Sequence, residues 1–167
     1  MEKQESLFLS ALEENQDKLY RICSIYSDSK EDSKDLFQEV LVHIWKSMNS
    51  FKGNSSIGTW MFRIALNVCL RFKSKYTKKQ NRLIKLDSIS ISNISSEQER
   101  ENDDEKLIAL RECIKKLNAG DKAMVALYLE ELRYREISDI LGISENHIAV
   151  KIKRIKSKLF NCINEKL

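Results

Sequence analysis

The sequence contains no proline and only four glycines, so few positions force the backbone out of a regular helix. Leu, Ile, Lys and Glu are frequent instead, and these residues favour helices with few interruptions. A chain of 167 residues can form one medium domain or two small ones. The composition therefore predicts an all-α protein.

Long apolar runs are also missing. No segment approaches the roughly 18 apolar residues of a membrane span, and Met1 to Glu5 lack the basic and then apolar layout of a signal peptide. We therefore expect a cytoplasmic protein without membrane insertion.

Residues that bind metals or carry out covalent catalysis are few and scattered. The cysteines stand more than 40 residues apart without a CxxC pair, which predicts neither a zinc site nor a disulfide framework. We expect buried, reduced thiols at Cys23, Cys69, Cys113 and Cys162. Because there is also no glycine-rich phosphate loop and no nucleophile beside a histidine, we expect no enzyme activity, metal or cofactor.

Charge is distributed along the chain in blocks. Residues 1–44 hold 5 basic and 10 acidic side chains, whereas residues 45–86 hold 10 basic and 0 acidic ones. Residues 87–112 are acidic again, and residues 146–167 hold 6 basic side chains against 1 acidic one. A single lysine-rich helix is more often a solvated face, but two long basic blocks with aromatic or turn residues favour nucleic acid as the partner.

Apolar residues recur at helical spacing along most of the chain. The spacing predicts helices over about residues 7–26, 31–48, 59–77, 106–117, 121–131, 133–141 and 145–162. A loop rich in glycine and serine, Phe51 to Gly58, separates the second helix from the third. On the buried sides of the first two helices we expect Leu7, Leu9 and Trp45.

A serine-rich stretch and then an acidic run follow the third helix without helical periodicity, which is typical of a linker. We place this linker at residues 81–104, between a domain of residues 1–80 and a smaller one of residues 105–167. The alternation of serine and isoleucine in residues 88–96 could instead form a short edge strand.

The clearest local pattern runs from Arg133 to Phe160. A short helix ends before Gly142, a residue that readily takes the left-handed conformation, and Ser144 is a good N-cap for the longer helix that follows. This layout is a helix-turn-helix, which many duplex DNA readers share. The longer helix has one apolar stripe, formed by Ile148, Ile152, Ile155 and Leu159.

The opposite face of that helix is polar and cationic, as in a recognition helix that lies in the major groove. We expect base reading by Asn146, Ala149, Val150 and Lys153. Phosphate attraction is expected mainly from Lys151, Arg154, Lys156 and Lys158. An αα-hairpin that packs against another protein is the alternative interpretation.

Aromatic residues lie in and beside the first basic block. Cations, interleaved aromatics and a polar loop suit the binding of unpaired nucleotides, whose bases stack or insert into pockets. Phe51, in the loop, is the best candidate for such a contact, whereas Phe37, Trp45 and Phe62 are expected in the core.

Several of these segments together resemble a known family. The runs Asp35-Leu36-Phe37-Gln38-Glu39-Val40, Phe51-Lys52-Gly53-Asn54-Ser55-Ser56 and Thr59 to Asn67 are similar to the second domain of bacterial extracytoplasmic-function sigma factors. Tyr134 to Ser144 resembles their fourth domain, and the motifs occur in the family's order. The resemblance implies two small helical domains, a sigma-2-like bundle and a sigma-4-like helix-turn-helix, joined by a flexible linker.

The resemblance also implies partners and residue roles. Bacterial core RNA polymerase would bind Asp35, Gln38 and Glu39. The melted non-template strand of the minus-ten element would contact Phe51, Lys52, Asn54, Arg63, Asn67, Arg71, Lys73 and Lys75. The minus-thirty-five element would be read as duplex by Asn146, Ala149, Val150, Lys151, Lys153 and Arg154. An anti-sigma factor is a further expected partner, and no cofactor is implied.

The sequence departs from the family pattern in the helix-turn-helix. Ala149 and Val150 stand where relatives often have Lys, Arg or Ser, so reading there would rest on apolar contact with thymine methyl groups. Ser138 stands where alanine is common. Two alternatives remain: a dimeric regulator, which leaves the basic residues 51–79 unexplained, and a helical protein-interaction module, which does not need a basic recognition helix.

Overall fold

The computed structural model describes residues 2–80 and 105–167, with side chains described for residues 2–72 and 105–167. Within these ranges the regular structure is seven α-helices and one 3-10 turn, without a strand, so the expected all-α fold is confirmed. None of the described helices is long and apolar enough to cross a membrane. The linker predicted at residues 81–104, and the alternative strand within it, lie outside the described residues.

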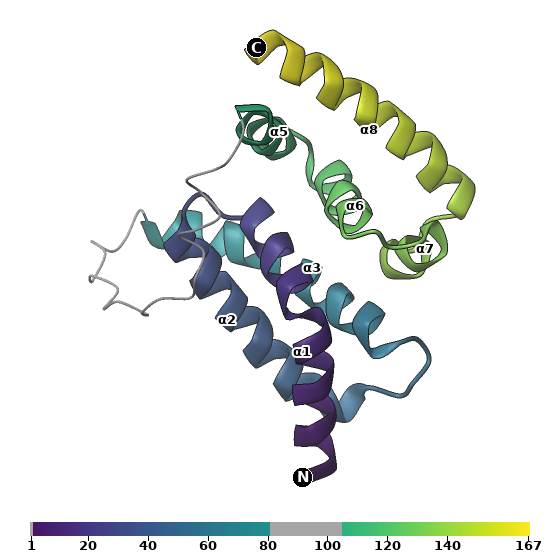
Figure 1. The fold of residues 1–167 in the computed structure, drawn as a ribbon. Helices are drawn as coiled ribbons and strands as arrows, with labels where there is room; N and C mark the ends of the chain where they lie inside the picture. Colours follow the sequence, from purple (N-terminus) through teal and green to yellow (C-terminus); the bar gives the residue numbers. More distant parts are fainter. Residues whose placement is uncertain (1, 81–104) are drawn as a thin grey trace.

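The first helix group contains three long helices that pack against one another (Figure 1). They are α1 (Glu2–Ile25), α2 (Lys30–Ser47) and α3 (Ile57–Gln80), and the short turn η1 (Met48–Ser50) follows α2. Ser29 is the N-cap of α2, because its side chain accepts a hydrogen bond from the Asp32 N–H at 3.1 Å. The core of this group includes Leu19, Ile22, Leu36, Val40, Ile44 and Met61.

The second group contains α5 (Glu105–Lys115), α6 (Ala119–Leu129), α7 (Tyr134–Leu141) and α8 (Glu145–Lys166). The long helix α8 contacts each of the other three (Figure 1). Asn118 caps α6, since its side chain accepts a hydrogen bond from the Asp121 N–H at 2.8 Å. We expected α6 to end at residue 131, but its last residue is Leu129. Glu131 takes a left-handed conformation with φ 63°, so it does not continue the helix.

The structure differs from the expectations in the bounds of two helices and in the exposure of three apolar side chains. Helix α1 begins at Glu2 rather than near residue 7, and the acidic Glu2 and Glu5 suit a helix N-terminus. Helix α8 extends to Lys166, past the predicted end at residue 162. Leu7, Leu9 and Trp45 were expected to be buried, but they are 43%, 54% and 45% exposed.

The expectation of four reduced thiols is wrong for two cysteines. Cys113 of α5 and Cys162 of α8 form a disulfide, whereas Cys23 and Cys69 are free and buried. The bond joins residues 49 positions apart in sequence, and it requires α5 to lie beside the end of α8. No local pattern in the sequence reveals this contact.

The two helix groups pack against each other, mainly α1 against α6 and α3 against α7 (Figure 1). Their buried residues belong to one hydrophobic cluster, and charged groups cross the boundary. Arg21 donates two hydrogen bonds of 2.8 Å to the Glu130 carboxylate, and Lys122 Nζ lies 5.6 Å from the centre of the Tyr26 ring. The division into separate domains with the bounds given above stays a prediction.

Candidate nucleic-acid interface

Helices α7 and α8 and the turn between them form a helix-turn-helix whose turn is held by local contacts. Gly142 has φ 72°, and its N–H donates to the Ser138 carbonyl at 2.8 Å. Ser138 Oγ donates to the Ile143 carbonyl at 2.5 Å, and Ser144 Oγ accepts from the His147 N–H at 3.2 Å. These contacts fix the direction in which α8 leaves the turn.

The apolar stripe of α8 anchors this helix on the rest of its group. Ile148, Ile152 and Ile155 are at most 1% exposed, and Leu159 is 8% exposed. Burial of one such aliphatic side chain contributes about 1.5–3 kcal/mol. The stripe therefore holds α8 in place without any contribution from its outward face.

The outward face of α8 carries most of the predicted duplex-contacting residues. They are all exposed to solvent, and they are Asn146, Ala149, Val150, Lys153 and Arg154. Val150 is 50% exposed, so its apolar side chain is available for contact. The structure thus places these five residues where a duplex could reach them.

Other lysines of α8 contact the remainder of the group. Lys151 and Lys158 each lie 3.6 Å from the carboxylate of Asp121, which is 7% exposed. Lys156 Nζ lies 4.6 Å from the centre of the Tyr128 ring, and a hydrogen bond with the Tyr128 side chain raises the pKa of Lys156. Sequence reasoning missed the role of Asp121, because this residue is distant from α8 along the chain.

The loop from Phe51 to Ser56 leads into α3. Ser56 Oγ accepts from the Thr59 N–H at 3.2 Å and so caps the helix. The Phe51 ring is half-buried, with its centre 5.2 Å from that of Trp60. Lys52 and Asn54 are exposed. The loop therefore combines a supported aromatic ring with exposed polar side chains, as single-strand binding requires.

A stripe of polar side chains continues from this loop along α3. Arg63, Asn67 and Arg71 are exposed and four residues apart, which places them on one side of the helix. Arg63 Nη2 donates to the carbonyl of Asp139 in α7 at 2.6 Å, so this side chain also connects α3 with the helix-turn-helix. The predicted Lys73 and Lys75 belong to α3, but their side chains lie outside the described ones.

Helix α2 presents the third predicted surface. Asp35, Gln38 and Glu39 are exposed on one side of the helix, and Glu39 Oε1 lies 3.7 Å from His43 Nε2. Val42 and Trp45 continue this side and are 47% and 45% exposed. Sequence reasoning missed these two residues, although their spacing from Gln38 follows the helical repeat.

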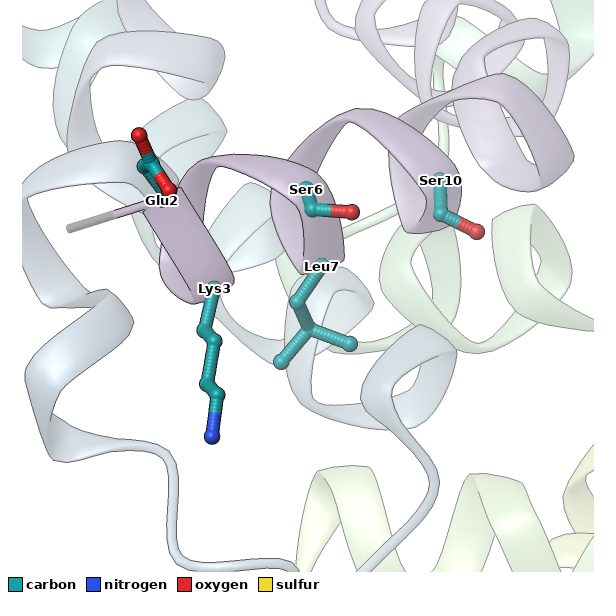
Figure 2. A pocket seen from close by; sticks show the side chains of 5 residues that line it. All are labelled: Glu2, Lys3, Ser6, Leu7 and Ser10. Carbon is teal, nitrogen blue, oxygen red and sulfur yellow. The ribbon is translucent and has the colours of Figure 1, made fainter.

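Hollows on the described part of the surface differ in depth and lining. A shallow one follows the first turns of α1, where Glu2, Lys3, Ser6, Leu7 and Ser10 line it (Figure 2). A cavity of about 400 Å³ lies between α1 and α2 on one side and α5 and α6 on the other. In residues 2–80 and 105–167, no three His, Cys, Asp or Glu side chains gather as metal ligands.

Comparison with known proteins accounts for both helix groups. The family model described as Sigma-70 region 2 matches residues 11–79. The model described as Sigma-70, region 4 matches residues 107–159. The first match includes α2, the loop and most of α3, and the second includes the whole turn between α7 and α8.

Individual relatives agree with these matches. The ECF RNA polymerase sigma factor SigG of Mycobacterium tuberculosis is 46% identical over 48 residues, which are 29% of this chain and only 13% of SigG. RNA polymerase sigma factor SigV of Bacillus subtilis is 23% identical over 150 residues, which cover 89% of this chain and 86% of SigV. A solved structure of the sigma factor RpoE from Bartonella quintana, in complex with the anti-sigma factor NepR, shares the fold, with TM-score 0.66, 18% identity and 98% of each chain covered.

Proposed function

We propose, from the premise that this chain belongs to the extracytoplasmic-function group of the sigma-70 family, that it acts as an alternative sigma factor. It binds core RNA polymerase, recognises the minus-thirty-five and minus-ten elements of a promoter, and stabilises the melted state. It carries out no covalent catalysis itself. Because bacterial polymerase transcribes in the cytoplasm, the chain acts there.

One observation carries this proposal: a single chain presents two exposed surfaces whose chemistry suits two different forms of nucleic acid. The outward face of α8 follows a capped turn and suits the major groove of a duplex. The Phe51 loop and the stripe on α3 combine aromatic, amide and guanidinium groups, which suit unpaired bases and their phosphates. A regulator that reads only duplex DNA has no use for the second surface.

The two surfaces divide promoter recognition between them. Asn146, Ala149, Val150 and Lys153 read base edges of the minus-thirty-five element, with Val150 against thymine methyl groups. Arg154 attracts the phosphates, together with Lys151 once a duplex competes with Asp121 for it.

The first helix group captures the melted non-template strand of the minus-ten element. Phe51, Lys52 and Asn54 receive an extruded base. The adjoining backbone is held by Arg63, Asn67, Arg71, Lys73 and Lys75. Extrusion of a base costs a few kcal/mol, and one aromatic stack returns about 1–3 kcal/mol. The loop therefore offsets most of the cost of one flipped base, and contacts with the adjoining backbone add to this stabilisation.

Two protein partners complete the proposal. The exposed side of α2 binds core polymerase through Asp35, Gln38 and Glu39, and the neighbouring Val42 and Trp45 add apolar area to this contact. The related RpoE structure contains an anti-sigma factor, and a protein antagonist of the same kind withholds this chain from polymerase.

The test is transcription by core polymerase on a library of genomic fragments. The purified chain is expected to direct initiation at discrete start sites that share two sequence elements at a fixed spacing. A known sigma factor serves as the positive control, and core polymerase alone as the negative one. If the positive control works and this chain directs no initiation and does not bind core polymerase, the proposal is wrong.

A further inference from the structure

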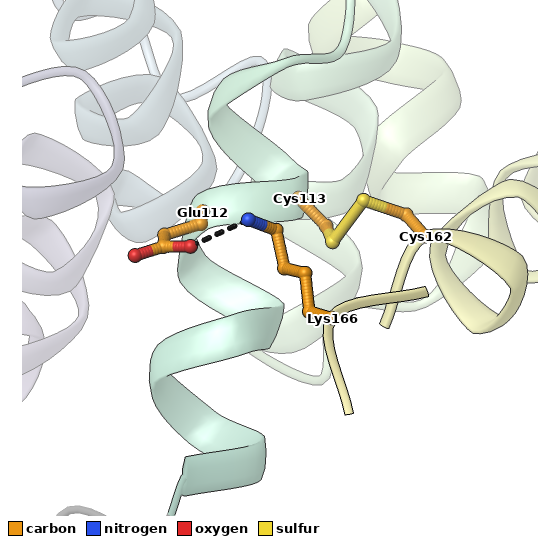
Figure 3. Close-up of a disulfide and its surroundings, with 4 residues drawn as sticks. All are labelled: Glu112, Cys113, Cys162 and Lys166. Atoms are coloured by element: carbon orange, nitrogen blue, oxygen red, sulfur yellow. Dashed lines mark hydrogen bonds and ion pairs between the residues drawn. A yellow bond between two sulfur atoms is a disulfide. The ribbon is translucent and has the colours of Figure 1, made fainter. Parts of the chain in front are cut away.

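Cys113 and Cys162 lie between α5 and the end of α8 (Figure 3). Their Cα atoms are 6.0 Å apart, a separation that suits a disulfide. Cys113 is 2% exposed, whereas Cys162 is only partly buried. Beside them Lys166 Nζ lies 2.7 Å from Glu112 Oε2. This ion pair joins the same two helices as the disulfide, and these helices also pack against each other.

We propose that Cys113 and Cys162 form a reversible redox site that sets how firmly α5 is held on α8, with small disulfides and thiols as its reactants. The cytoplasmic location of this redox site rests on the proposed function. Thiols are kept reduced there, and the disulfides that do form are usually transient, catalytic or redox-sensing. A permanent cross-link does not fit that compartment, whereas an exchangeable pair does.

Oxidation takes two exchange steps. The Cys162 thiolate, which is the more accessible, attacks one sulfur of a small disulfide such as oxidised glutathione and displaces a small thiolate. The Cys113 thiolate then attacks the Cys162 sulfur of the mixed disulfide and displaces the second small thiolate. The two protein thiols lose two electrons and two protons, and one small disulfide becomes two small thiols. Reduction reverses both steps.

The bond encloses the whole duplex-reading unit. The two cysteines are 49 positions apart, and the segment between them contains α6, α7 and most of α8, including the turn at Gly142. A cross-link over a loop of this length restricts the unfolded chain strongly, and we expect it to raise the thermal midpoint by about 10 °C. Oxidation also holds α5 in place as one wall of the cavity that α5 forms with α1 and α2.

The other two cysteines provide an internal control. Cys23 and Cys69 are both 0% exposed in the core of the first group. A hydrogen bond between the two side chains, together with burial, raises the pKa of Cys69. Because both thiols lack access to solvent, and the raised pKa disfavours the thiolate of Cys69, they do not exchange in the folded protein.

The experiment equilibrates the full chain in graded ratios of reduced to oxidised glutathione, traps free thiols by alkylation and identifies the bonded pair by mass spectrometry. We expect one reversible two-electron transition that joins Cys113 to Cys162, while Cys23 and Cys69 stay unmodified until the protein is denatured. The oxidised form melts about 10 °C above the reduced form.

Variants separate this site from the rest of the fold. Cys162→Ser abolishes the transition and the rise in melting temperature, whereas Cys23→Ala keeps both. A bond that survives dithiothreitol in the native protein, a pair that does not form in oxidised glutathione, or equal melting temperatures would each overturn the proposal. These readouts need neither DNA nor polymerase. Promoter-directed transcription by the reduced chain tests the proposed function separately.

Discussion

Replacing Lys153 and Arg154 together by alanine removes two cations from the outward face of α8. Both side chains are exposed, and neither belongs to the buried stripe, so the fold should persist. Each cation that neutralises a phosphate contributes about 0.9 to the slope of log affinity against log salt. Arg154 contributes one such contact and Lys153, at the base edges, at most another, so we expect the slope for a minus-thirty-five duplex to become shallower by about 0.9 to 1.8, with weaker binding at low salt.

The matched control removes two cations from the same helix that already have a partner. Lys151 and Lys158 both lie 3.6 Å from Asp121. The control variant is Lys151→Ala with Lys158→Ala, and Asp121→Asn is added so that no unpaired carboxylate stays buried. Since Asp121 neutralises part of both charges in the free protein, we expect this variant to change the slope less than half as much.

Fluorescence anisotropy of a labelled duplex over a salt series measures both slopes, and thermal melting checks that each variant is folded. Equal slope changes in the two variants would refute the distinction between the outward cations and the lysines paired with Asp121. An unchanged slope for the Lys153 and Arg154 variant, with a normal melting curve, would remove the outward face of α8 from duplex binding.

Three further predictions concern the loop, the boundary between the helix groups and the turn. Phe51→Ala is expected to lower open-complex formation, measured by permanganate reactivity of unpaired thymines, by about tenfold, the equivalent of one lost base stack. Closed complexes, measured by gel shift, are expected to persist, and equal loss of both complexes contradicts a role in strand capture. Arg21→Ala leaves the Glu130 carboxylate, which is 6% exposed, without its bidentate partner. Because the Arg21 side chain is itself 57% exposed, we expect the packing of the two helix groups against each other to lose only about 1–2 kcal/mol. Small-angle scattering should then show a larger radius of gyration than for the native chain. An identical profile contradicts a role of the Arg21–Glu130 ion pair in holding the two helix groups together. Gly142→Ala forces a side chain to φ 72° and should lower the free energy of unfolding by about 1 kcal/mol, whereas Gly120→Ala within α6 should raise it slightly; denaturant titrations that move in the same direction rule out the backbone explanation.

The features that sequence reasoning predicted correctly depend on residues within a few positions of one another. Gly142 and Ser144 fix the turn through contacts inside a short segment, and the stripe of Ile148, Ile152 and Ile155 follows from the helical repeat alone. The caps at Ser29 and Asn118 also act over three residues, although sequence reasoning did not name them. Such local contacts do not depend on how the helices pack, so the sequence is sufficient to predict them.

The features that it missed depend on how helices pack. Trp45 is exposed because α2 packs with its other side inward, although its spacing also fits an apolar face. Asp121 meets Lys151, and Cys113 meets Cys162, only because α8 lies across α6 and α5. Contacts between residues thirty or more positions apart leave no periodic signal, so the sequence alone could not place them.

The separation of the buried stripe of α8 from its outward face has an evolutionary consequence. Ile148, Ile152 and Ile155 cannot change without disturbing the buried core, but Asn146, Val150 and Lys153 are exposed and take no part in it. Gene duplicates of this chain could therefore acquire new target promoters through a few codon changes at the outward positions. A laboratory selection could retarget the protein in the same way, by randomising those codons and leaving the stripe intact.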